Sequence, residues 1–286
     1  MNGSLLVVDG AKNQVVQFSD RDPAVINASI FIRSWSGTNQ LTTPYNLFLD
    51  KTRSPYDLYV SDSGSHRVLL FSAMQARNPT PRIVAGIGAS GSSLNQLNTP
   101  CGIALDRQKN LIIADYLNHR VVRYSPNATS GTVLIGTGSQ GSDSVSLRNP
   151  SGLFFDEINA LLYVADVFNH RIQRYSLNVS SFPLNGTTVA GGHGQGSAMD
   201  QLNQPYDLWI SNKTGAIYIA DSNNHRIQRW QRGASTGVTI AGDPLGLSGS
   251  NATLLKFPYR IAINADETFL YVSDGLNSRI QRFQLI

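Results

Sequence analysis

Short apolar runs, separated by polar and glycine-containing turns, recur along the whole chain of 286 residues. The stretch from 100 to 136 shows the pattern, with the runs PCGIALD, LIIAD, RVVRY and TVLIG. Such runs are rich in Val, Ile, Leu and Tyr and are bounded by Gly, Asn, Asp, Ser and Pro, which is typical of β-strands. No stretch has sustained helical spacing. The pattern therefore predicts an all-β protein built from groups of four antiparallel strands.

The groups are copies of one another. The segment IIADYLNHRVVRY, residues 112–124, returns in similar form along the chain, and each copy is anchored by an aspartate. The six anchoring aspartates are Asp9, Asp62, Asp115, Asp166, Asp221 and Asp274, at separations of 53, 53, 51, 55 and 53 residues. Four-stranded units repeated at this period are typical of a β-propeller. We therefore predict one domain, residues 1–286, with six blades.

The first and last blades are predicted to be incomplete. The first unit begins with SLLVVD, residues 4–9, which corresponds to the second strand of the other units. The last unit ends with RIQRFQLI, residues 279–286, which corresponds to a third strand. We expect either a fragment of a longer chain or an imperfect ring.

The segment PSGLFFDEINALLYVADVFNHRIQRY, residues 150–175, resembles the NHL repeat. That repeat has the pattern Pro-x-Gly, an apolar strand ending in Asp, a turn, Tyr-Val-Ala-Asp, and then Asn-His-Arg-Ile. The resemblance is strong in blades 2 to 6 and weak in blade 1. It implies a six-bladed propeller, in agreement with the count of units.

The recurring Asp, His and Arg look like catalytic residues, but their recurrence indicates a structural role. An active site is formed once, whereas this set occurs in blade after blade. We predict a tight turn between the second and third strands, in which the arginine pairs with the aspartate. The GxGxxG matches at 86–91 and 136–141 lack the helix that a nucleotide site requires, so they are predicted to be connections between blades.

Composition excludes several classes of site. Cys101 is the single cysteine, so no intrachain disulfide can form. His193 is the one histidine outside the repeat, so we predict no metal site and no cofactor. No apolar run is long enough for a membrane span, and no signal peptide is visible, which leaves a cytoplasmic location open. The net charge of +4 comes with the repeat arginines, so nucleic acid is a possible but not favoured partner.

Enzymatic function is not favoured. The fold resembles that of peptidyl-hydroxyglycine α-amidating lyases, whose zinc-binding histidines follow the strand-leading prolines. The corresponding residues in this chain contain no histidine and are Tyr45, Cys101, Ser151, Tyr206 and Tyr259. The resemblance to six-bladed lactonases implies a calcium site to which Asn46 and Asp207 could contribute, but Gly102, Gly152 and Arg260 stand at the equivalent places.

Two non-catalytic alternatives remain. NHL propellers of tripartite-motif ubiquitin ligases recognise RNA or protein, which would make this chain a recognition module. The favoured alternative is an interaction module, outside the cell or in the secretory pathway, that binds a protein or peptide on one propeller face. Its support is seven potential N-glycosylation sites, against about three or four expected by chance. They are Asn2, Asn27, Asn127, Asn178, Asn185, Asn212 and Asn251.

Two surfaces are candidates for ligand binding. The first is an apolar patch formed in blades 3 and 4 by the two residues after the anchoring aspartate, namely Tyr116, Leu117, Val167 and Phe168. The second is a polar and aromatic site beside the strand-leading prolines, formed by Tyr45, Tyr206, Asp207, Tyr259 and Arg260. In both cases the alternative is that the side chains pack within the fold.

Overall fold

The computed structural model describes residues 4–19, 28–32, 40–52, 54–72, 81–178 and 182–285. The chain forms two compact units, residues 1–133 and 134–286. The single domain over residues 1–286 stays a prediction.

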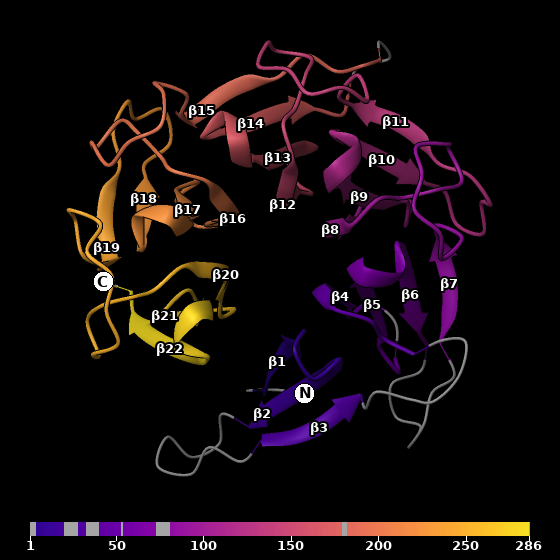
Figure 1. Ribbon diagram of the computed structural model, residues 1–286, viewed down its shortest axis with the longest axis horizontal. Coiled ribbons are helices and arrows are strands. Elements are labelled where there is room, and N and C mark those ends of the chain that lie inside the picture. Colours follow the sequence, from indigo (N-terminus) through magenta and orange to yellow (C-terminus); the bar gives the residue numbers. More distant parts are fainter. Residues whose placement is uncertain are drawn as a thin grey trace. The chain divides into compact units, whose positions relative to one another are not determined.

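The first unit contains the strands of blades 1 to 3 (Figure 1). Blade 1 is the three-stranded sheet β1-β2-β3, and blade 2 is the sheet β4-β5-β6-β7. Blade 3 is the sheet β11-β10-β9-β8, whose last strand extends across the boundary at residue 133. The strand bounds are β1 Ser4–Asp9, β2 Gln14–Ser19, β3 Ala28–Ile32, β4 Pro44–Asp50, β5 Asp57–Asp62, β6 Arg67–Phe71, β7 Arg82–Ala85, β8 Pro100–Leu105, β9 Leu111–Asp115, β10 Arg120–Tyr124 and β11 Thr132–Ile135.

The second unit contains blades 4 to 6, which are the sheets β12-β13-β14-β15, β16-β17-β18-β19 and β20-β21-β22. Neighbouring strands pair antiparallel. The strand bounds are β12 Pro150–Asp156, β13 Leu161–Asp166, β14 Arg171–Ser176, β15 Thr187–Gly191, β16 Pro205–Ile210, β17 Ile217–Asp221, β18 Arg226–Trp230, β19 Val238–Gly242, β20 Pro258–Ile263, β21 Phe269–Asp274 and β22 Arg279–Gln284. The predicted fold is therefore confirmed as an all-β, six-bladed β-propeller with three strands in the first and last blades.

A single turn of 3-10 helix joins the second and third strands of blades 2 to 6. These turns are η1 Ser63–Ser65, η2 Tyr116–Asn118, η3 Val167–Asn169, η4 Ser222–Asn224 and η5 Gly275–Asn277. Each turn ends at a residue with left-handed backbone, such as His225 with φ +54°. The turn then places the anchoring aspartate directly opposite the arginine of the third strand, as Asp221 lies opposite Arg226. The predicted tight turn is present in each of these blades.

The core consists of apolar side chains packed between successive sheets. Within the second unit, Ile172 and Ile219 are fully buried in a cluster shared by blades 4 and 5. Leu255 and Val272 belong to a second cluster shared by blades 5 and 6. The leucines of the blade connections, including Leu97 and Leu202, are fully buried. Burial of a second strand on both faces explains why those runs are almost wholly apolar.

Two equivalent tyrosines allow a prediction about buried hydroxyl groups. The Tyr124 hydroxyl donates to the Leu94 carbonyl at 2.8 Å, whereas the buried Tyr175 hydroxyl has no hydrogen-bond partner among the described residues. Tyr124→Phe is therefore expected to lower the free energy of unfolding by about 1 kcal/mol. Tyr175→Phe is expected to leave the free energy unchanged or to raise it. Urea unfolding of the two variants compares them, and equal losses would contradict the assignment.

Candidate functional site

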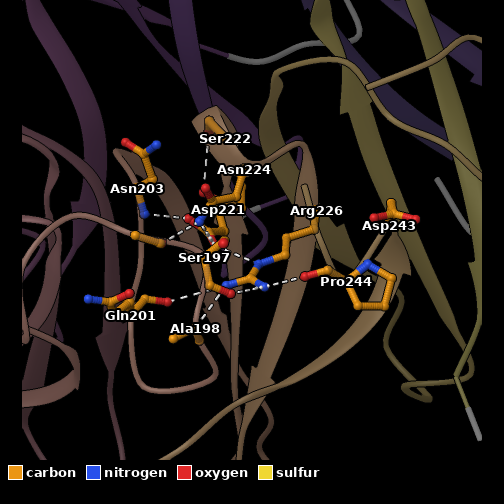
Figure 2. A network of polar contacts seen from close by, with 12 residues as sticks. Ser197, Ala198, Gln201, Asn203, Asp221, Ser222, Asn224, Arg226, Asp243 and Pro244 are labelled. Atoms are coloured by element: carbon orange, nitrogen blue, oxygen red, sulfur yellow. Dashed lines mark hydrogen bonds and ion pairs between the residues drawn. The ribbon is translucent and has the colours of Figure 1, made fainter. Parts of the chain in front are cut away.

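The anchoring aspartate of each blade is the centre of a buried polar network, shown for blade 5 in Figure 2. The Oδ1 of Asp221 accepts a hydrogen bond from the Asn203 backbone at 2.7 Å. Its Oδ2 accepts from Asn224 Nδ2 and from Arg226 Nε, both at 2.8 Å. The Arg226 guanidinium also donates to backbone carbonyls of the connections on either side, including Pro244 at 2.8 Å. All these partners are backbone or side-chain groups of the blade and its connections. The repeated Asp–Arg pair therefore holds the connections in place.

Burial raises the pKa of Asp221, and hydrogen bonds and the arginine offset part of this effect. Equivalent Asp–Arg pairs lie at 2.7–2.9 Å in blades 2, 3, 4 and 6. The predicted pairing of the turn arginine with the anchoring aspartate is therefore confirmed in these blades, and the recurring cluster is scaffold.

The repeat histidines have a role that sequence analysis missed. The Nδ1 of His225 accepts a hydrogen bond from the Phe257 backbone at 3.1 Å, and that of His170 accepts from the Gln204 backbone at 3.2 Å. Each bond joins the turn of one blade to the residue just before the strand-leading proline of the next. The signal for it was in the sequence, because each histidine stands at a fixed place before the repeat arginine.

The first position of the 3-10 turn faces the next blade. Ser222 Oγ donates to the Pro258 carbonyl and Ser63 Oγ to the Pro100 carbonyl, both at 2.5 Å. Val167 occupies this position in blade 4 and is 0% exposed. The prediction that Val167 forms part of an exposed patch is therefore wrong, because a side chain at this position points into the fold.

The other members of the predicted apolar patch differ in exposure. Leu117 is 48% exposed, and Tyr116 is half-buried. Phe168 is half-buried, with the Arg148 guanidinium 5.7 Å from its ring centroid. The second position of the turn is thus the one that reaches solvent. A joint patch of these side chains stays a prediction.

Three aromatic side chains form a cluster on blades 5 and 6. Tyr206 is the second residue of β16, and Tyr259 is the second residue of β20. Their ring centroids lie 5.7 Å apart, and Phe257 contacts both rings at 5.5 and 4.8 Å. All three are half-buried. We call these three residues the aromatic cluster. Phe257 was not predicted, although its place beside the strand-leading Pro258 could have indicated it.

An ion pair connects the same two strands. Asp207 Oδ1 lies 2.9 Å from Arg260 Nη1, and Asp207 Oδ2 accepts from the Ile261 backbone at 3.0 Å. Burial raises the pKa of Asp207, and the Arg260 charge and backbone donors lower it in part. The structure thus brings Tyr206, Asp207, Tyr259 and Arg260 together. Tyr45, the fifth predicted member, is half-buried in β4 of the first unit.

The described residues contain no group of three or more His, Cys, Asp or Glu side chains that could hold a metal ion. Within the same part of the chain, no helix has the length and apolar character needed to cross a membrane. Cys101 is buried and unpaired by any disulfide. The aromatic cluster, with the Asp207–Arg260 pair on the same strands, is suited to binding a ligand by apolar contact and hydrogen bonding.

The potential glycosylation sites that the structure describes all lie at the surface. The exposed asparagines are Asn127, Asn178, Asn185, Asn212 and Asn251. Asn2 and Asn27 lie outside the described residues. Exposure is required for a glycan but does not establish one, so modification stays a prediction.

Curated relatives match parts of the chain. It is 26% identical over 205 residues to the protein SUPPRESSOR OF QUENCHING 1, chloroplastic, of Arabidopsis thaliana, covering 66% of this chain and 19% of that protein. It is 33% identical over 148 residues to NHL repeat-containing protein 2 of Bos taurus, covering 44% and 20%. The chain thus corresponds to a small part of these relatives. NHL repeat-containing protein 3 of Mus musculus is 22% identical over 268 residues, covering 76% and 75%.

Solved structures share the fold at low identity. The crystal structure of a nidogen/laminin complex matches with a TM-score of 0.69 and 18% identity, covering 99% of this chain and 89% of that chain. A catalytically inactive virginiamycin B lyase from Staphylococcus aureus matches with a TM-score of 0.61 and 12% identity, covering 100% and 78%. These likenesses concern the fold alone.

The NHL repeat model matches residues 202–230, which run from the end of a blade connection through β16, β17, η4 and β18. This segment contains the anchoring Asp221 and the buried Arg226 of the polar network. It also contains His225, which bonds to the next blade. The resemblance of the repeats to the NHL repeat is confirmed by this match and by the NHL repeat-containing proteins to which parts of the chain are similar.

Proposed function

We propose that this chain is a non-catalytic interaction module and that a protein or peptide ligand contacts the aromatic cluster. The NHL propeller fold is typical of protein-interaction modules. The observation that carries the proposal is the grouping of Tyr206, Phe257 and Tyr259 within 4.8–5.7 Å, with their rings only half-buried.

Aromatic rings of this kind are suited to ligand contact. Tyrosine offers a large apolar face and a hydroxyl group with little loss of side-chain entropy, and it is enriched at binding hot spots. The rings are fixed by packing on one another, and Tyr259 also lies against Gly275 of η5. A site that is already ordered costs less entropy on binding than one that must form.

The Asp207–Arg260 pair supports the same proposal. Arg260 Nη1 lies 2.9 Å from the buried Asp207 carboxylate, so this ion pair joins β16 and β20 directly after Tyr206 and Tyr259. It helps to keep the two strands, and hence the rings, in a fixed arrangement before a ligand binds. The proposed ligand is therefore a peptide segment with an apolar side chain for the rings.

Selection from a displayed random-peptide library tests this proposal. Enriched peptides are expected to lose at least about tenfold in affinity when Tyr206 is changed to alanine, as at a binding hot spot. Leu117→Ala, in the competing apolar patch, is the control and is expected to change the affinity by less than about twofold. The reverse order of the two effects would move the site to the turn after Asp115. Absence of enriched peptides would contradict the proposal.

A further inference from the structure

Both tyrosines of the aromatic cluster follow a backbone segment of unusual conformation. Gln204 precedes Pro205 and Tyr206 with φ +51°, and Phe257 precedes Pro258 and Tyr259 with φ +53°. Left-handed backbone is disfavoured for residues with a side chain, and a following proline favours an extended conformation. Some contact must therefore hold each segment in place.

In both cases a histidine of the preceding blade makes a contact of that kind. His170, at the end of η3, accepts the Gln204 N–H at 3.2 Å. His225, at the end of η4, accepts the Phe257 N–H at 3.1 Å. The accepting atom is Nδ1 in each ring, and it can accept a hydrogen bond only when it carries no proton. Both bonds therefore require neutral histidine.

The surroundings favour the neutral form. Burial lowers the pKa of His170, and the Arg148 charge lowers it further. Burial also lowers the pKa of His225, where Lys256 acts in the same direction and Asp274 and the Ser222 backbone act against it. The charged groups that act on the two rings are Arg148, Lys256 and Asp274. Since both pKa values lie below that of an unfolded histidine, the contribution of each bond to stability is complete above about pH 6.5 and is lost as the pH falls.

We propose that His170 and His225 are positioning residues that make the aromatic cluster sensitive to pH. In the neutral form they hold the segments that carry Tyr206, Phe257 and Tyr259 in the geometry of the cluster. When protonated, each ring loses its acceptor and presents a second donor to the N–H. The segment then loses one of the hydrogen bonds that fix it, while others, such as the bond from the Gly275 N–H to the Phe257 carbonyl, remain. The effect on ligand binding rests on the proposed function, whereas the effect on the cluster itself does not.

Blade 1 supplies a version of the same contact that does not titrate. There, Asn13 Oδ1 accepts the Thr43 backbone N–H at 2.6 Å, and Thr43 also has left-handed backbone just before a strand-leading proline. Asparagine can thus take the place of histidine in this fold. The double variant His170→Asn/His225→Asn is therefore a matched control that retains an acceptor at every pH.

Amide hydrogen exchange followed by NMR tests the proposal without any ligand. Between pH 7.5 and pH 4.5, protection of the Gln204 and Phe257 amides, corrected for intrinsic exchange, is expected to fall about fivefold to tenfold, the value of one hydrogen bond. Contacts between the Tyr206 and Tyr259 rings, seen as nuclear Overhauser effects, should weaken over the same range. Amides of β17 and β21 should keep their protection, which shows that the blades remain folded.

The asparagine double variant is expected to change by less than about twofold over this range, because its acceptors do not titrate. An equal fall in wild type and variant, or no fall in wild type, would overturn the proposal. If the variant does not fold, the histidine ¹⁵N shifts of the wild type decide instead. An Nδ1 that carries a proton at pH 7.5 in either ring would overturn the proposal. Failure of the peptide selection described above, with the exchange result as expected, would refute the proposed function and leave this inference standing.

Discussion

Changing Asp221 to alanine is expected to lower the free energy of unfolding by about 3–5 kcal/mol, because it leaves a buried arginine without its counter-ion. Both side chains are almost fully buried, at 0% and 2% exposed for Asp221 and Arg226. The substitution also removes the acceptor for the Asn203 backbone and for the Asn224 amide (Figure 2). Urea unfolding followed by tryptophan fluorescence measures the loss, since Trp230 is on the adjoining strand.

Blade 1 again provides the matched control. Asp9 is only half-buried and lies opposite Gln14 instead of an arginine. It accepts hydrogen bonds from the Lys12 backbone and from Gln14 Nε2, both at 3.1 Å. Asp9→Ala is therefore expected to cost about 1 kcal/mol. Comparable losses at Asp9 and Asp221 would show that the buried Asp–Arg pair is not what makes the anchoring position important.

Repetition is the reason that the fold could be predicted from the sequence. The spacing of the anchoring aspartates defined the six units, and the apolar runs between Pro100 and Gly136 defined four strands within one of them. Recurrence also identified the Asp–Arg pairs as structural and not catalytic, because Asp115 and Arg120 form the same pair as the equivalent residues of the other blades. A feature that occurs in every blade is constrained by the contacts that every blade shares.

Features that depend on one residue's direction could not be predicted in this way. Val167 seemed exposed because it lies in a turn, but the first position of a 3-10 turn points toward the next blade. Leu117, at the second position, is 48% exposed. The sequence places both residues after an aspartate and does not say which of them faces the fold.

The site could be predicted only in part, for a related reason. Tyr206 and Tyr259 were found because each follows a strand-leading proline, and adjacent blades bring such positions together. Phe257 was missed because it precedes the proline, in a segment that would ordinarily be extended. Its backbone is left-handed, its ring packs against both tyrosines, and its N–H donates to His225 of the preceding blade. The cluster is thus a consequence of contacts between blades, which no single repeat encodes.

Glycine at the end of the fourth strand is expected to be required by the path of the backbone. Gly242 has φ +82°, and a Cβ atom there would lie 2.4 Å from the His225 carbonyl oxygen and 2.9 Å from the Arg226 Cα. These are backbone atoms of the adjoining strand and turn, so they cannot move aside without disturbing the Asp221–Arg226 network. The left-handed conformation costs about 1–2 kcal/mol for alanine, and overpacking adds about 1–3 kcal/mol. Gly242→Ala is therefore expected to lower the free energy of unfolding by about 2–5 kcal/mol.

Gly194 separates the two contributions. It has φ +84°, nearly that of Gly242, but a Cβ atom there would have nothing within 4 Å. Gly194→Ala is expected to show the conformational cost alone, about 1–2 kcal/mol. Urea unfolding of both variants gives the difference, which measures the close approach of β19 to the turn that ends at His225. Gly191→Ala, with the equivalent approach to the His170 carbonyl at 2.4 Å, should match Gly242→Ala. A loss at Gly242 no larger than that at Gly194 would show that the adjoining backbone moves aside without cost, and that the contact of β19 with the turn in blade 5 is looser than these distances indicate.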